Sequence, residues 1–125
     1  MPRRRDDFAK AGYVPALGDV VHLNWSPAAG HEMKDPHYGL VLSDDLFNQA
    51  TGYVVVAPIT SKGGKLSGFE LPLQAGRVDG VVVLSGLRSL DYQARSIPFE
   101  AAAPAATTAE ANRRVRMIFP SRDSG

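Results

Sequence analysis

Short apolar runs separated by turn residues dominate the middle of the chain. Each run is rich in Val, Leu, Ile or aromatic residues, and glycine or proline lies at or near its ends. This length and composition predict β-strands. The five runs cover residues 20–25, 38–43, 53–59, 69–73 and 80–84. In the first, His22 and Asn24 alternate with Val21 and Leu23, as expected for a strand with one buried face.

Helical signals are fewer and shorter. Ser43 or Asp44 can cap a short helical turn before Gly52, and residues 92–95 can form another. Thr107 is followed three residues later by Glu110, the spacing of a capping box, which predicts a C-terminal helix that ends at Pro120. Residues 74–80 predict a turn, residues 87–92 alternate in polarity, and the Ala- and Pro-rich residues 97–106 predict little regular structure.

The order of these elements predicts the fold class. Five to seven short strands precede one C-terminal helix, and strands do not alternate with long helices. The pattern therefore favours a mainly β protein, a small antiparallel barrel with short helical insertions and a C-terminal helix. We expect a tail at residues 1–14, one domain at 15–120 and a second tail at 121–125. The first tail carries Arg3, Arg4 and Arg5, either as a solvated arm or as a contact for a polyanion.

Composition narrows the possible functions. A chain of 125 residues predicts one domain, and the absence of cysteine excludes disulfides, a thiolate nucleophile and cysteine metal sites. No apolar run approaches the ~20 residues of a membrane-spanning helix, and the basic N-terminus has no apolar segment after it. We therefore expect a cytoplasmic protein without a membrane partner. Because the net charge is only +1, any nucleic-acid binding must come from a local patch.

The segment between the first two strands concentrates chemically active groups. His31, Glu32, Lys34 and His37 lie in this loop, whose ends are held by strands. Loops positioned by a rigid scaffold often carry function. A zinc site built from His22, His31 and His37 is conceivable, but the sequence does not fix its geometry.

The polar residues fit the needs of RNA cleavage without a metal. A base must accept the proton of the ribose 2′-hydroxyl, an acid must protonate the leaving 5′-oxygen, and a donor must hold the phosphate. Glu32 is a candidate base, and His37 is a candidate acid or base because imidazoles titrate near neutral pH. Thr60, with a lysine or arginine, is a candidate phosphate donor. The cations in question are Lys62, Lys65, Arg88 and Arg95. The alternative is that these side chains are scattered surface polar groups.

Four segments, in order, carry a resemblance to a known family. They read GDVVHLNWSPAAGHEM, YGLVLS, TGYVVVAPIT and DGVVVLSGLRSLDYQAR. Their order and spacing, from Tyr13 to Arg95, resemble the MazF/PemK family of bacterial toxin endoribonucleases.

The resemblance implies a fold, an activity and partners. The expected fold is a small SH3-like barrel with a C-terminal helix, assembled as a homodimer. The expected activity is that of a type II toxin-antitoxin toxin that cleaves single-stranded mRNA at short sequences without metal or cofactor, leaving 2′,3′-cyclic phosphate and 5′-hydroxyl ends. A cognate antitoxin would cover the RNA surface. Glu32 and Thr60 match family positions and, with His37, form the expected catalytic set. The RNA-binding candidates are Asn24, His31, Lys34, Ser61, Lys62, Arg88 and Arg95.

The chain also departs from the family pattern. His37-Tyr38 stands where the family has arginine and proline, Met33 replaces a glutamine, and Ser85-Gly86 replaces aspartate and glutamine. Arginine holds phosphate with a permanent charge, whereas histidine can move a proton. Two outcomes follow: His37 serves as the general acid, or the site is weakened. In the second case the barrel would act by binding RNA or a protein, as a gyrase-poisoning toxin of related fold does.

Overall fold

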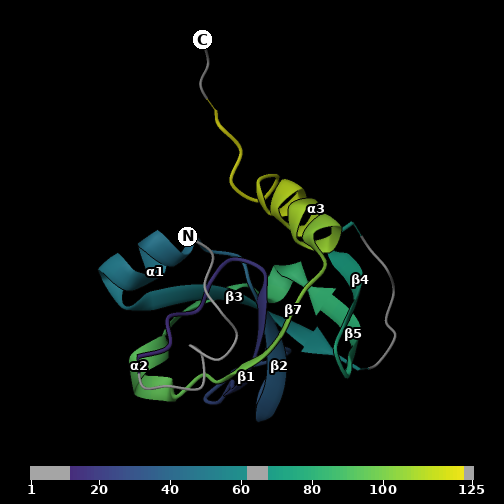
Figure 1. Ribbon diagram of the computed structural model, residues 1–125. Helices are drawn as coiled ribbons and strands as arrows, with labels where there is room; N and C mark the ends of the chain where they lie inside the picture. Colours follow the sequence, from purple (N-terminus) through teal and green to yellow (C-terminus); the bar gives the residue numbers. More distant parts are fainter. Residues whose placement is uncertain (1–11, 62–67, 123–125) are drawn as a thin grey trace.

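The computed structural model describes residues 12–61 and 68–122 (Figure 1). The strands are β1 (Asp19–Asn24), β2 (Pro36–Val41), β3 (Tyr53–Thr60), β4 (Glu70–Ala75), β5 (Val78–Val83), β6 (Arg88–Asp91) and β7 (Phe99–Ala102). The helices are α1 (Asp45–Thr51), α2 (Tyr92–Arg95), α3 (Ala105–Val115) and the short 3-10 helix η2 (Leu84–Gly86). Within the described ranges, no helix is long and apolar enough to cross a membrane.

The strands form one antiparallel sheet in the order β4-β5-β3-β2-β1-β7, and β6 also pairs with β3. The start of β3 pairs with β6, at Tyr53 and Asp91, and its end pairs with β5, at Thr60 and Val81. Because β3 changes partner along its length, the sheet curves into a half-barrel, with α3 over one end and α1 and α2 toward the other (Figure 1). The predicted mainly β, antiparallel fold with short helices and a C-terminal helix is confirmed.

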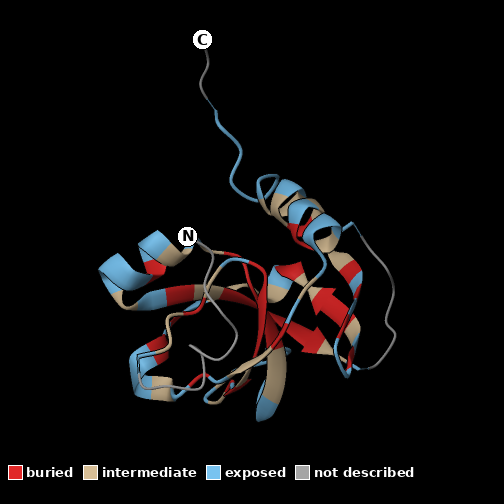
Figure 2. Cartoon of the chain, viewed as in Figure 1, coloured by how far each residue is buried: buried red, intermediate tan, exposed pale blue. Residues whose placement is uncertain are grey.

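Both faces of the central strands are buried (Figure 2). Val20 and Val21 are neighbours on β1 and are both fully buried, but they belong to different apolar clusters. The first cluster lies beneath α3, and the second surrounds Trp25. Gly39 makes room for this tryptophan, because a Cβ at position 39 would lie 2.8 Å from Trp25 Cζ2 and 2.6 Å from Val56 Cγ2.

The chain reaches this second cluster before β1 begins. Tyr13 and Val14 pack against it, and Pro15 is fully buried. The Tyr13 hydroxyl donates a hydrogen bond of 2.7 Å to the Asp19 carboxylate, and the Ala16 N–H donates one of 2.9 Å to the same oxygen. The arginine arm at residues 3–5 lies outside the described residues.

The two predicted helical turns are confirmed, and each is capped by an aspartate. The Asp44 carboxylate accepts from the Leu46 N–H at 3.0 Å, and α1 ends at Gly52, which has a φ of 77°. The Asp91 carboxylate accepts from two N–H groups at the start of α2. Short polar side chains at these positions satisfy N–H groups that a helix leaves unpaired.

The predicted bounds of the C-terminal helix are wrong at both ends. It begins at Ala105, directly after Pro104, and has no side-chain cap, so the Thr107–Glu110 capping box does not form. Proline cannot continue a strand ladder, whereas the alanines that follow favour helix. The helix ends at Val115, and tighter bonds such as Met117 N–H to the Arg114 carbonyl, 3.0 Å, continue the chain toward Pro120.

Two expectations about the strands also fail. Residues 99–102 form β7, an edge strand paired with β1, although their composition predicted little regular structure. The turn predicted at residues 74–80 is shorter, since β4 extends to Ala75 and β5 starts at Val78. Gly76 in this turn has a φ of 58°, which favours glycine.

Candidate functional site

The β1–β2 loop is closed by hydrogen bonds at its base. The Trp25 N–H donates to the Asp35 carbonyl at 3.1 Å, and the Asp35 N–H donates to Ser26 Oγ at 2.9 Å. The indole Nε1–H of Trp25 also donates to the His37 carbonyl at 3.3 Å. The buried tryptophan therefore ties the backbone at His37 to the core.

Two arginines hold this loop from a distant part of the chain. Arg88 Nη1 donates to the Trp25 carbonyl at 2.6 Å, and its guanidinium carbon lies 6.0 Å from the indole centroid. Arg95 Nη1 donates to the carbonyls of Asn24, at 3.0 Å, and Ser26, at 3.1 Å. Both arginines were candidates for RNA contact, and in the fold their guanidinium groups bind the backbone of the loop.

Four of the predicted residues line one cavity of about 550 Å³. They are His31, Glu32, Lys34 and His37, and the lining also includes Asp35, Pro58, Ser85 and Gly86. The Glu32 carboxylate oxygen Oε1 accepts from the Ala29 N–H at 2.8 Å, which fixes the direction of this side chain. We call this space the loop cavity.

Thr60 ends β3 next to this region. Tyr38 pairs with Ile59, and the same register carried one residue further brings His37 opposite Thr60. Gly80 on β5 allows the close approach, because a Cβ there would lie 2.5 Å from the Thr60 carbonyl oxygen. The pairing of β2, β3 and β5 thus brings Thr60 beside His37, so these two catalytic candidates are neighbours.

The remaining candidates do not line the loop cavity. Asn24 is exposed, and its Oδ1 accepts from the Ser26 N–H at 3.0 Å. Lys62 and Lys65 lie outside the described residues. Ser61 lines a second cavity, described next.

A second cavity, of about 290 Å³, is also lined by His37. We call it the hairpin cavity, because Arg77 and Asp79 of the β4–β5 hairpin line it together with His22, Tyr38 and Ser61. The rings of His22 and Tyr38 meet edge to face, with centroids 5.0 Å apart. Sequence reasoning missed Arg77 and Asp79, since only the sheet pairing brings this hairpin to His37.

Charges around the two cavities are few and mostly exposed. Arg77 pairs with Glu100, Nε to Oε2 at 2.9 Å, and this hydrogen bond is the main cause that raises the pKa of Arg77. The described residues contain no group of three His, Cys, Asp or Glu side chains placed to hold a metal. In particular, His22, His31 and His37 do not form the zinc site considered above.

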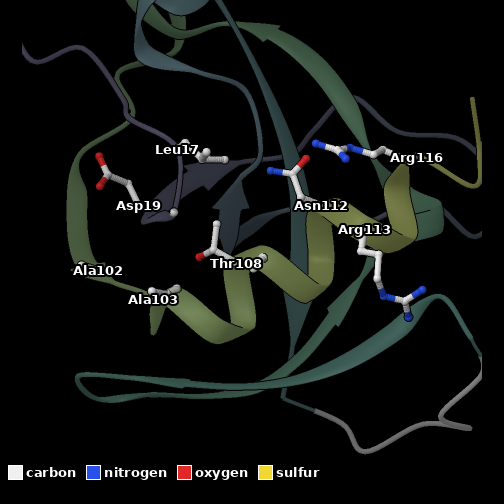
Figure 3. Close-up of a pocket in the computed structure, with 11 residues that line it drawn as sticks. Leu17, Asp19, Ala102, Ala103, Thr108, Asn112, Arg113 and Arg116 are labelled. Atoms are coloured by element: carbon white, nitrogen blue, oxygen red, sulfur yellow. The ribbon is translucent and has the colours of Figure 1, made fainter.

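A groove of about 540 Å³ beside α3 is as large as the loop cavity but differs in chemistry (Figure 3). Its walls are mainly small or apolar, with Leu17, Ala103 and Thr108 among them, and Asn112 and Arg116 lie at its rim. The one carboxylate in its lining, Asp19, already accepts the two hydrogen bonds described above. The groove therefore lacks a carboxylate and an imidazole placed for acid–base chemistry.

Comparisons with known proteins agree with the fold. Residues 16–119 match the family model of the PemK-like, MazF-like toxin of type II toxin-antitoxin systems. Endoribonuclease toxin ChpB of Escherichia coli K12 is 42% identical over 83 residues, which span 62% of this chain and 71% of that protein.

Solved structures of MazF proteins are also similar to this chain. MazF of Deinococcus radiodurans superposes with a TM-score of 0.78 and 39% identity, over 86% of this chain and 97% of that one. A MazE-MazF structure of the same organism gives a TM-score of 0.72 and 33% identity, over 86% and 96% of the two chains. The chain therefore belongs to the PemK-like, MazF-like family of type II toxin-antitoxin toxins and is an endoribonuclease.

Proposed function

We propose that the chain cleaves single-stranded mRNA in the cytoplasm at short specific sequences, without metal or cofactor. The observation that carries this proposal is the loop cavity, where the Glu32 carboxylate and the His37 imidazole line one space beside the end of β3. A carboxylate and an imidazole are the pair that acid–base cleavage of RNA needs.

The proposed step uses the ribose as the nucleophile. Glu32 accepts the proton of the 2′-hydroxyl, and the 2′-oxygen forms a bond to phosphorus. The bond from phosphorus to the 5′-oxygen breaks, and protonated His37 delivers a proton to that oxygen. The products are a 2′,3′-cyclic phosphate and a 5′-hydroxyl end, so atoms and charge balance without a further reactant.

Thr60 and Lys34 are the proposed stabilisers of the phosphate. Lys34 lines the loop cavity, and the register brings Thr60 beside His37. A donor and a cation directed at the non-bridging oxygens stabilise the charge that develops there. Arg88 and Arg95 support the step indirectly, because they hold the backbone of the loop that carries Glu32 and His37.

Product analysis tests this chemistry directly. The purified protein is incubated with single-stranded RNA in excess EDTA, and the ends of the fragments are identified. We expect cleavage with 2′,3′-cyclic phosphate and 5′-hydroxyl ends, and none at a site carrying a 2′-deoxy substitution. Cleavage of the deoxy site, or loss of all cleavage in EDTA, would refute the proposed step. Intact RNA under every condition would favour the weakened-site alternative.

We propose that a cognate antitoxin covers the loop cavity. The family model describes toxins of type II toxin-antitoxin systems, and the MazE-MazF structures of Deinococcus radiodurans are similar over most of the chain. Covering His37 and Glu32 would block access to both proposed catalytic groups. Protection of RNA by a co-expressed small protein encoded beside the toxin tests this proposal.

We also propose a homodimer, as the family resemblance implies. Three large apolar residues after α3 are exposed: Met117 by 60%, Ile118 by 38% and Phe119 by 69%. Contiguous exposed apolar side chains are typical of interaction surfaces. This segment is therefore the proposed contact between protomers.

A further inference from the structure

We propose that the hairpin cavity is a nucleobase-binding subsite, which takes one of the two bases that flank the cleaved phosphate and selects it. The inference rests on the proposed endoribonuclease function and adds the origin of its sequence preference. The walls of the hairpin cavity come from β1, β2, the end of β3 and the β4–β5 hairpin.

The position of His37 connects this cavity to the proposed chemistry. His37 lines both the loop cavity and the hairpin cavity. A phosphate held at His37 and Thr60 would therefore border both cavities. An RNA strand that crosses His37 would place the nucleotides before and after the cleaved bond toward these two spaces.

The hairpin cavity suits a base by its aromatic wall. His22 and Tyr38 are half-buried, and their rings are fixed against one another edge to face at 5.0 Å. Single-stranded RNA is commonly recognised through bases that leave the stack and contact aromatic side chains such as tyrosine and histidine. Ordered rings lose little conformational entropy when a base binds.

The polar groups suit the edge of a base. Arg77 is oriented by Glu100, which accepts from Nε at 2.9 Å and from Nη2 at 3.3 Å. An arginine carries five N–H donors, so further donors remain for a ligand. Asp79 is exposed and supplies an acceptor. An oriented donor next to an acceptor can read the hydrogen-bonding edge of a base.

The charge of the cavity argues against a phosphate as its occupant. Arg77 is neutralised by Glu100, and Asp79 adds a negative charge. Arg77, Glu100 and Asp79 together carry one net negative charge, which disfavours a phosphate beside them. A neutral base is compatible with this wall, because it brings no charge into it.

Sequencing the 5′ ends of fragments from a random RNA pool tests the subsite. The variants are Asp79→Asn and Arg77→Gln, both exposed, with Asp45→Asn and Arg122→Gln as matched controls outside both cavities. We expect each hairpin variant to weaken the base preference on one side of the cut by at least about fivefold, and to leave the preference on the other side intact. The controls should keep the wild-type pattern. Cleavage by both hairpin variants with unchanged preferences on both sides would overturn the proposal.

A binding measurement separates this proposal from the proposed function. Fluorescence anisotropy compares an oligoribonucleotide containing the preferred sequence, or one of fixed mixed sequence if no cleavage occurs, with copies carrying a single abasic site. For the wild type, one abasic position should lower affinity at least about fivefold, and in Asp79→Asn this loss should largely disappear. If the wild type shows this coupling but does not cleave, the subsite stands and the endoribonuclease mechanism fails. If abasic sites lower the affinity of both proteins equally, or RNA does not bind, the subsite is refuted.

Discussion

His37 is shared by the linings of the loop cavity and the hairpin cavity. Its carbonyl accepts a hydrogen bond from the buried indole of Trp25. The family pattern has arginine at this position, so the proposed proton donor differs in chemistry from the family residue. Histidine is charged only part of the time near neutral pH, whereas arginine is always charged.

Replacing His37 with arginine distinguishes proton transfer by an imidazole from phosphate binding by a permanently charged guanidinium. In the wild type, the cleavage rate should fall as pH rises, because an imidazole that delivers a proton must be protonated. In His37→Arg this fall should be absent. Single-turnover rates with one oligoribonucleotide measure the effect, and Asp45→Asn serves as a control that keeps the wild-type profile. Parallel profiles for wild type and His37→Arg would contradict a role of His37 in proton transfer.

The local sequence predicted which residues would share the loop cavity, but not what the arginines do. His31, Glu32, Lys34 and His37 are close in sequence, so strands at both ends suffice to gather them. The bonds made by Arg88 and Arg95 span 63 to 71 residues. No local pattern encodes such contacts, because they depend on how β6 and α2 are placed by β3.

At the scale of elements, the β1–β2 loop is held by contacts from outside itself. Arg95 is the strongest test, since it bonds the carbonyls on both sides of Trp25. Arg95→Gln should lower the free energy of unfolding by roughly 1.5–3 kcal/mol, the range for hydrogen bonds to charged groups. Urea denaturation measures this change.

A kinetic measurement on the same variant distinguishes positioning from RNA contact. If Arg95 positions the loop, Arg95→Gln should lower kcat and leave the salt dependence of RNA binding unchanged. A variant with normal stability and a smaller salt slope would instead identify Arg95 as a phosphate contact.

Helix α3 is stabilised by charge pairs that respond to acid. Hydrogen bonds from Arg113 and Arg114 lower the pKa of Glu110 from 4.5 to about 2. Because this pKa is lower in the folded state, the stabilisation is complete above about pH 4.5 and is lost as pH falls toward 2. Thermal unfolding at pH 7, 4 and 2.5 should show a smaller acid-induced drop in Tm for Glu110→Gln than for the wild type. An equal drop in both proteins would contradict this role of Glu110.

Elements rich in β-branched residues were predictable, and elements defined by pairing were not. The run YVVVAPI has strong strand propensity and forms the central strand β3. Residues 99–102, FEAA, have little such propensity and become a strand through pairing with β1. Likewise, α3 starts directly after Pro104, which follows the end of β7, and not at the capping box predicted from Thr107.

At the scale of the whole molecule, curvature of the sheet brings together the residues of the proposed site. β3 pairs with β2 on one side and with β5 near its end, so the β1–β2 loop and the β4–β5 hairpin face each other across His37. The fold class and the residues of the loop cavity could be predicted from the sequence. The hairpin cavity could not, because it depends on strand order, which the pattern of apolar residues does not specify.

The proposed dimer is also a property of the whole molecule. The double variant Met117→Asp/Phe119→Asp should shift the mass in solution from dimer to monomer, because charges in an apolar contact oppose its burial. Light scattering after size-exclusion chromatography measures the mass. Leu46→Asp is the matched control, since Leu46 is 73% exposed on α1, away from this segment. A dimeric double variant, or a monomeric wild type, would contradict the proposed contact.

Single-turnover cleavage of an oligoribonucleotide in EDTA, compared among wild type, Glu32→Gln, His37→Gln and Asp45→Asn, tests the central claim most directly. If the Glu32 carboxylate and the His37 imidazole are the base and the acid, each of the first two substitutions should lower the rate by about 10²–10⁴-fold, with folding unchanged by circular dichroism. Asp45→Asn should cleave at the wild-type rate. Wild-type rates in both Glu32→Gln and His37→Gln would contradict the assignment of the loop cavity as the active site.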